Sequence, residues 1–104
     1  MFKDEVFEYL TKIPKAKVVT YSQIARALNR PKACRAVGNI LHSNTEPVRY
    51  PCFKVVNNEG RLSDAYGFGG FIEQRRRLLE DGVELVGNHV DLKKYQWQDG
   101  NETK

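Results

Sequence analysis

The sequence predicts a small α/β domain that is mainly helical, with a helix-turn-helix core and a short β-hairpin. The chain has 104 residues, which is enough for one small domain and too few for two. Apolar residues repeat at helical spacing in several segments, and Gly87-Asn88 between two short apolar runs is a hairpin signal. We expect one domain over residues 1–98 and a polar tail over residues 99–104.

Charge and cysteine content narrow the classes of function. The 17 basic and 13 acidic residues give a net charge of +4, a mild bias that is consistent with a nucleic-acid partner without establishing one. Cys34 and Cys52 do not make a disulfide framework. The chain has no Cys-x-x-Cys, and His42 and His89 are far apart, so we expect no metal site and no cofactor. No apolar run is long enough to cross a membrane and the N-terminus lacks the apolar core of a signal peptide, so we expect a cytoplasmic (or nuclear) protein.

The N-terminal half should contain three helices. The first is expected over residues 3–13 and ends before Pro14. Its core-facing residues, three and four positions apart, are Val6, Phe7, Leu10 and Ile13. The second follows a capping box made by Thr20 and Gln23, and the third is expected over residues 31–43 with Pro31 in its first turn. Their core-facing residues are Ile24, Ala25 and Leu28 in the second helix and Ala33, Val37, Ile40 and Leu41 in the third.

The second and third helices form a helix-turn-helix pattern whose second helix carries Lys32 and Arg35. The pattern alone leaves simple helix packing and DNA binding open. Gly38 lies inside the third helix, where glycine costs about 1 kcal/mol relative to alanine. Either core helix packing or close approach to a DNA backbone would compensate for that cost.

The C-terminal half should be more irregular. We expect a loop over residues 44–51, a strand over 53–56, a turn over 57–60, and residues 61–63 returning alongside. The glycine-rich loop 65–70 lacks the lysine and the setting of a phosphate-binding loop, which excludes nucleotide binding. Its two aromatic residues either stack on an unpaired base or fill the core.

One further helix and the hairpin complete the predicted fold. The helix is expected over residues 71–81 with Gly82 as its C-cap. The residues expected to repeat on one face of this helix are Ile72, Arg75, Leu78 and Leu79. The hairpin strands are expected over residues 83–86 and 89–92.

The segment from Arg35 to Cys52 carries the chemistry. Cysteine is the strongest soft nucleophile in proteins, and here Cys52 lies between a proline and a β-branched strand, not far from a basic helix. The joint order of Arg35-Ala36-Val37-Gly38, Asn44, Pro51-Cys52 and Gly69-Gly70 resembles the O6-alkylguanine-DNA alkyltransferases and their alkyltransferase-like relatives. The resemblance extends from about Phe2 to Trp97 and covers the DNA-binding domain of the transferases.

The resemblance implies a role for each matching residue. Arg35 is similar to an arginine that intercalates where a flipped nucleotide was, and Tyr21 to a tyrosine that pushes on the target phosphate. Further expected DNA contacts are Lys32, Ala36 and Gly38, on a helix that enters the minor groove. The expected catalytic group consists of Cys52 as alkyl acceptor, Asn44 as the brace of the preceding turn, and Asp81 near the position of a glutamate in the proton relay. The expected lesion pocket consists of Pro51, Tyr66, Phe68 and Gly69.

The chain departs from the family at one decisive position. Active members have Pro-Cys-His-Arg-Val, and this chain has Pro-Cys-Phe-Lys-Val over residues 51–55. Phe53 can neither accept nor pass a proton, so the relay from thiol to carboxylate is interrupted. Two functions stay open: a suicide methyltransferase that uses Cys52 once, and a non-catalytic lesion sensor that directs excision repair. A plain helix-turn-helix regulator would leave the Pro-Cys motif and the glycine loop without a purpose.

The resemblance also implies the partners. These are double-stranded DNA containing alkylated guanine and, for the alkyltransferase-like branch, excision-repair proteins. We expect the protein to act as a monomer.

Overall fold

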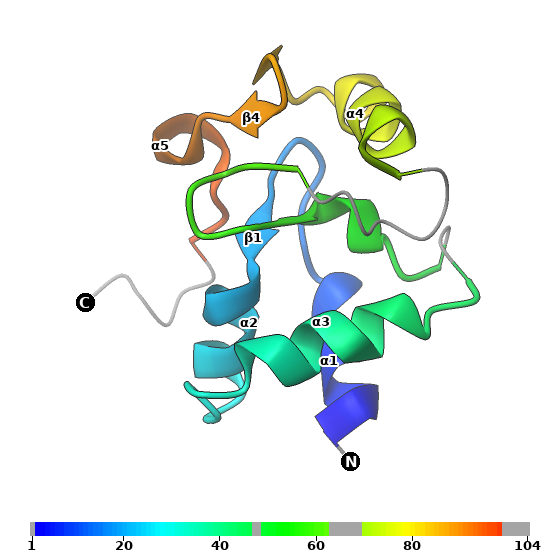
Figure 1. The fold of residues 1–104 in the computed structure, drawn as a ribbon, viewed down its shortest axis with the longest axis vertical. Helices are drawn as coiled ribbons and strands as arrows, with labels where there is room; N and C mark the ends of the chain where they lie inside the picture. Colours follow the sequence, from blue (N-terminus) through cyan, green and yellow to red (C-terminus); the bar gives the residue numbers. More distant parts are fainter. Residues whose placement is uncertain (1, 47–48, 63–69, 99–104) are drawn as a thin grey trace.

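The computed structural model of the protein describes residues 2–46, 49–62 and 70–98 (Figure 1). Helices dominate, and the strands pair into two small two-stranded sheets, so the expected mainly helical α/β class is confirmed. No helix among the described residues is long and apolar enough to cross a membrane. The division into a domain and a tail stays a prediction, because residues 99–104 lie outside the described part of the chain.

Helix α1 (Phe2–Leu10) presents one face to the core, as its apolar spacing predicts. Val6, Tyr9 and Leu10 are buried, and Phe7 is half-buried. The helix is shorter than the expected 3–13, because residues 11–13 form tighter turns in which each amide donates to the carbonyl three residues before it.

Helices α2 (Tyr21–Ala27) and α3 (Cys34–His42) pack against each other in the expected order. The capping box is confirmed: Thr20 Oγ1 accepts from the Gln23 amide at 3.0 Å, and Gln23 Oε1 accepts from the Thr20 amide at 3.3 Å. The expected start of the third helix at Pro31 is wrong. Residues 31–33 form a turn closed by the Ala33 amide on the Arg30 carbonyl, and α3 begins only at Cys34.

A parallel sheet joins the two halves of the chain. Strand β1 (Val19–Thr20), which the sequence did not predict, pairs with β2 (Val55–Val56) in the register Val19↔Val55. The expected strand 53–56 is therefore only half correct. Residues Cys52–Lys54 form a 3₁₀-helix, because the Lys54 amide donates to the Pro51 carbonyl at 3.1 Å.

The C-terminal part consists of α4 (Gly70–Glu80), the β3–β4 hairpin (Leu85–Val86 and His89–Val90), and the short helix α5 (Leu92–Tyr95). The hairpin is confirmed, with Leu85 opposite Val90. Gly82 follows α4 with a φ of +99°, which confirms it as the residue that ends the helix. Arg61 pairs with His89 of the hairpin and not with the strand at 53–56, which corrects the expected return for residues 61 and 62, while residue 63 lies outside the described residues.

The expected face of α4 is correct only in part. Ile72, Arg75 and Leu79 share one side of the helix, with Ile72 72% exposed and Leu79 45% exposed, whereas Leu78 lies on the opposite, buried side. The cause is Gln74, which is buried and donates through Nε2 to the carbonyl oxygens of Phe53 and Val55, both at 3.0 Å. These bonds hold the Gln74 side of α4 against the 3₁₀-helix and turn Ile72 and Leu79 outward.

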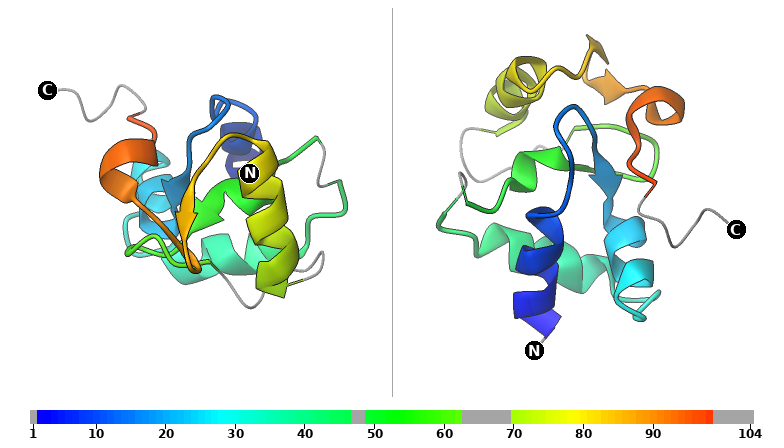
Figure 2. Two further views of the ribbon diagram at one scale, coloured as in Figure 1. Left: turned by 90° about the horizontal axis from the view of Figure 1, so that it is seen from above. Right: turned by 180° about the vertical axis from the view of Figure 1, so that it is seen from behind.

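The core has two adjoining parts. One lies among α1, α2 and α3, and the other lies beneath α4, the hairpin and α5. Phe53 packs against both. Figure 1 shows the first three helices at one end of the molecule and α4 with the hairpin at the other, and the view from behind in Figure 2 shows the same division. The segment that contains Cys52 lies at their junction.

Candidate nucleic-acid interface and lesion site

The outer side of α3 carries an unpaired positive charge. Cys34, Arg35 and Ala36 in its first turn are all exposed. Arg35 makes no hydrogen bond or ion pair with any residue that the structure describes, and the same holds for Lys32 in the preceding turn. A guanidinium held on a helix without a protein partner keeps all its donors available for a ligand.

Gly38 opens the same side of the helix. A Cβ atom added there would meet only the ring of Tyr21, at 4.0 Å from Cε1, which is an ordinary contact. Packing inside the protein therefore does not require a glycine at this position. Of the two interpretations that the sequence leaves open, close approach of another molecule is the one compatible with this geometry. The contact also places Tyr21, at the start of α2, beside the middle of α3.

Asn44 connects the end of α3 to the cysteine. Its Nδ2 donates to the Tyr50 carbonyl at 2.8 Å and lies 3.3 Å from Cys52 Sγ, and its Oδ1 accepts from the Glu46 amide at 2.8 Å. The side chain is buried, so these bonds are shielded from water. Asn44 thus binds the backbone of Glu46 and Tyr50 and contacts the Cys52 thiol at the same time.

The Cys52 thiol is buried and holds its proton. Burial raises its pKa, and the hydrogen bond from Asn44 and the positive charge of Arg77 offset this only in part. The thiolate is the reactive form of cysteine, so at neutral pH only a small fraction of Cys52 is nucleophilic. The pKa of Cys52 stays raised even though a 3₁₀-helix begins at this residue.

The carboxylate of Asp81 is held by an ion pair. Asp81 Oδ2 accepts from Lys54 Nζ at 2.7 Å and from the Ala16 amide at 2.9 Å. Lys54 is buried and also donates to the Pro14 carbonyl at 2.8 Å. Lys54 was not among the site residues expected from the sequence. The available signal was that Lys54, directly after Phe53, replaces the arginine of the family motif. Within the described part of the chain, no hydrogen bond connects Asp81 to Cys52.

Only part of the expected lesion pocket is described. Pro51 is half-buried and directly precedes Cys52. Tyr66, Phe68 and Gly69 lie outside the described residues, so their expected place in the pocket stays a prediction.

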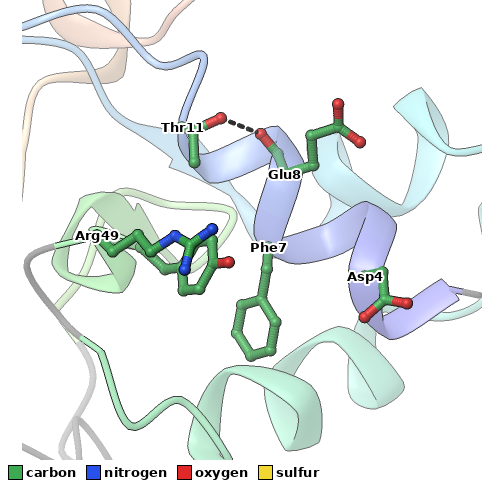
Figure 3. A pocket seen from close by; sticks show the side chains of 6 residues that line it. Asp4, Phe7, Glu8, Thr11 and Arg49 are labelled. Atoms are coloured by element: carbon green, nitrogen blue, oxygen red, sulfur yellow. Dashed lines mark hydrogen bonds between the residues drawn. The ribbon is translucent and has the colours of Figure 1, made fainter.

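A separate cavity of about 410 Å³ lies on the α1 side of the loop (Figure 3). Its lining residues are Asp4, Phe7, Glu8, Thr11, Arg49 and Tyr50. The rings of Phe7 and Tyr50 stack with centroids 5.0 Å apart, and the Tyr50 carbonyl accepts from both Asn44 Nδ2 and the Cys52 amide. The two carboxylates on its wall make this cavity unsuited to phosphate. We interpret it as a cavity behind the segment that leads to Cys52, and not as a binding site. No cluster of three or more metal-ligating side chains occurs among the described residues.

Comparison with known proteins gives a consistent picture. Residues 1–83 match the domain family described as "6-O-methylguanine DNA methyltransferase, DNA binding domain". A "DNA base-flipping protein" of Vibrio parahaemolyticus is 34% identical over 100 residues, which is 93% of this chain and 96% of that protein. A "Bifunctional methyltransferase/endonuclease" of Picrophilus torridus is 38% identical over 92 residues, which is 88% of this chain but only 30% of that larger protein.

The fold matches solved structures of the same group. The crystal structure of S. pombe Atl1 in complex with damaged DNA containing O6-carboxymethylguanine superposes with a TM-score of 0.85 and 30% identity, covering 93% of this chain and 94% of that one. The M. tuberculosis OGT structure in complex with DNA has a TM-score of 0.72 and 32% identity, covering 77% of this chain and 48% of that one. The chain belongs to the 6-O-methylguanine DNA methyltransferase family and corresponds to its DNA-binding domain.

Proposed function

We propose that this protein recognises O6-alkylguanine in duplex DNA by flipping the nucleotide out of the stack, and that it holds the lesion without efficient methyl transfer. The observation that carries the proposal is the outer side of α3, where Arg35 is exposed and has no partner among the described residues, and where Gly38 leaves room for another molecule. The names of the base-flipping and alkyltransferase-like relatives, and the damaged DNA bound to Atl1, support it.

The DNA would approach along α3. With Gly38 in place of a larger residue, a sugar-phosphate backbone can come close to the helix in the minor groove. Lys32 and Arg35 would neutralise phosphates or enter the stack, and Arg35 is placed to fill the space that the flipped nucleotide leaves. Tyr21, beside Gly38, would press on the phosphate of the flipped nucleotide.

Flipping is required by the position of the lesion. In the duplex the target nucleotide is paired and stacked, so its O6-alkyl group cannot enter a site beside Cys52 until the nucleotide is extruded. The flipped base would then lie near Cys52 and Pro51, with Tyr66, Phe68 and Gly69 as the further proposed lining residues.

The chemistry at Cys52 supports binding of the lesion without methyl transfer. Methyl transfer forms an Sγ–carbon bond, breaks the O6–carbon bond, and requires that the thiol proton leaves. Here burial keeps the proton on Sγ, Phe53 offers no acceptor, and Asp81 is held by Lys54. Single-turnover transfer stays a second candidate, because the Asn44 amide contact to Sγ would stabilise a thiolate if one formed.

A sensor without efficient transfer needs a further protein to complete repair. We propose that the protein acts in the cytoplasm as a monomer on its DNA, and that excision-repair proteins take over the marked site. No metal or cofactor takes part in this scheme.

The proposal is tested by binding. Fluorescence anisotropy should be measured with two duplexes that differ only in one O6-methylguanine, at several salt concentrations. We expect the lesion duplex to bind at least about tenfold more tightly, with affinity for both duplexes falling as salt rises. Equal affinity for the two duplexes would refute lesion recognition. The same titration with 2-aminopurine next to the lesion reports flipping, because unstacking raises its fluorescence.

A further inference from the structure

The large exposed apolar side chains among the described residues lie on α4 and the adjoining hairpin. Four large apolar residues among those described are substantially exposed: Phe71 (36%), Ile72 (72%), Leu79 (45%) and Val86 (82%). Three lie on α4 and the fourth on the β3–β4 hairpin. The outer side of α3, by contrast, presents Arg35, Ala36 and Asn39. Clustered apolar exposure of this kind marks an interaction surface more often than scattered single residues do.

The spacing of these residues makes a continuous helix face. Phe71, Arg75 and Leu79 are four residues apart and Ile72 lies beside them, so all four share one side of α4. The opposite side, with Gln74 and Leu78, is buried. Arg75 Nε donates to the Gly87 carbonyl at 3.3 Å, which brings the hairpin with Val86 against the same side. We call this surface, formed by Phe71, Ile72, Arg75, Leu79 and Val86, the α4 face.

Among the described residues, the positive charge of Arg75 at the centre of the α4 face has no acidic partner. The neighbouring Arg76 is paired with Glu73 and Glu80, and Arg77 is paired with Glu73. The only hydrogen bond of Arg75 to another described residue is the one to the neutral Gly87 carbonyl. An occupant that fits this surface therefore has apolar side chains and one carboxylate among them.

We propose that the α4 face docks an amphipathic helix of another protein, which places apolar residues over Ile72, Leu79 and Val86 and a carboxylate opposite Arg75. A helix face with apolar residues one and two turns apart is suited to a second helix whose apolar residues have the same spacing. A second copy of this chain is a poorer occupant. Two α4 faces related by a twofold axis near the middle of the helix would place Arg75 against Arg75.

The α4 face is separate from the outer side of α3. In Figure 1 and in the view from behind in Figure 2, α4 and the hairpin lie at the end of the molecule away from α1 and α3. The proposal therefore does not rest on the function proposed for α3 and Cys52. A protein helix on α4 would leave Arg35 and Gly38 uncovered.

The test uses the full chain and two synthetic peptides. Both are short amphipathic helices with leucines along one face, and they differ only in having glutamate or lysine among those leucines. Binding is measured by calorimetry and by amide chemical-shift changes, with the parent and with Arg75→Glu, Ile72→Ser and, as a matched charge reversal on α1, Lys3→Glu. Thermal unfolding verifies that each variant is folded.

We expect the glutamate peptide to bind the parent and Lys3→Glu with shifts confined to α4 and the hairpin. Ile72→Ser and Arg75→Glu should each weaken this binding about tenfold, and Arg75→Glu should prefer the lysine peptide. The proposal is overturned if the glutamate peptide does not bind, or if the parent binds both peptides equally. It is also overturned if sedimentation shows a dimer of the parent that Ile72→Asp abolishes, since the α4 face would then belong to a second copy.

Discussion

Lys54 Nζ lies 2.7 Å from Asp81 Oδ2, and this ion pair joins the cysteine segment to the end of α4. Lys54 also donates to the Pro14 carbonyl at 2.8 Å, and its side chain is 6% exposed while that of Asp81 is 17% exposed. The aspartate expected to draw a proton from Cys52 thus has a structural partner. Phe53, beside the cysteine, replaces the histidine that would carry the proton. Lys54, the next residue, holds the Asp81 carboxylate in the ion pair.

The ion pair should matter for stability. Lys54→Met leaves the Asp81 carboxylate largely buried without its counter-charge, and we expect the free energy of unfolding to fall by about 3 kcal/mol. Arg76→Met is the matched control, because it also breaks ion pairs but at an exposed site, where little change is expected. Urea unfolding of both variants measures the difference, and equal losses would show that the buried pair has no special weight.

Arg35 should contribute to lesion binding without contributing to the fold. Arg35→Ala removes an exposed side chain that has no partner in the described part of the chain, and we expect weaker binding of a lesion duplex by about 1–3 kcal/mol with unchanged thermal unfolding. Lys93→Ala on α5 removes an exposed charge elsewhere and controls for the loss of net charge. If Arg35→Ala and Lys93→Ala bind lesion DNA alike at matched salt, Arg35 does not fill the stack.

Gly38→Ala should change the stability of the protein and its affinity for DNA in opposite directions. Alanine is the better helix former by up to about 1 kcal/mol, and the nearest atom to its Cβ would be Tyr21 Cε1 at 4.0 Å, so Gly38→Ala should stabilise the protein. The same methyl group would point to the approaching DNA and should weaken binding. Chemical unfolding and anisotropy on one preparation measure both effects. A destabilised variant would mean that the glycine serves internal packing after all.

The raised pKa of Cys52 should make stability depend on alkaline pH. The folded protein keeps the thiol proton over a pH range in which an unfolded chain, with a thiol pKa of about 8.5, has released it. The free energy of unfolding should therefore fall as pH rises above that value. Cys52→Ala removes this contribution, so the difference in stability between parent and variant should narrow with rising pH. A difference that is constant from neutral to alkaline pH would contradict the raised pKa.

Local signals in the sequence predicted the local structure well. The capping box of Thr20 and Gln23, the hairpin around Gly87, and the end of α4 at Gly82 each depend on a few neighbouring residues, and the structure has all three. The resemblance to a family supplied the expected site residues, whose roles stay predictions, and it drew attention to Phe53 as the departure from the family motif.

Long-range contacts could not be predicted from the sequence. The pairing of Val19 with Val55 involves strands of only two residues, too short to leave a periodic signal. The outward side of α4 follows from the bonds of Gln74 to the backbone of residues 53 and 55, which are 21 and 19 positions away. The ion pair of Lys54 with Asp81 spans 27 positions and was missed for the same reason.

The intact mass of the protein recovered from its complex with an O6-methylguanine duplex tests the central claim most directly. We expect the parent to bind and to keep its mass, because Cys52 holds its proton and Phe53 cannot remove it. Phe53→His supplies an imidazole and should gain one methyl group on Cys52, faster than the parent by up to about 10²–10⁴-fold. Phe53→Leu, which alters the same core packing without adding a base, should stay unmodified. A parent protein that acquires the methyl group as fast as Phe53→His would contradict the account.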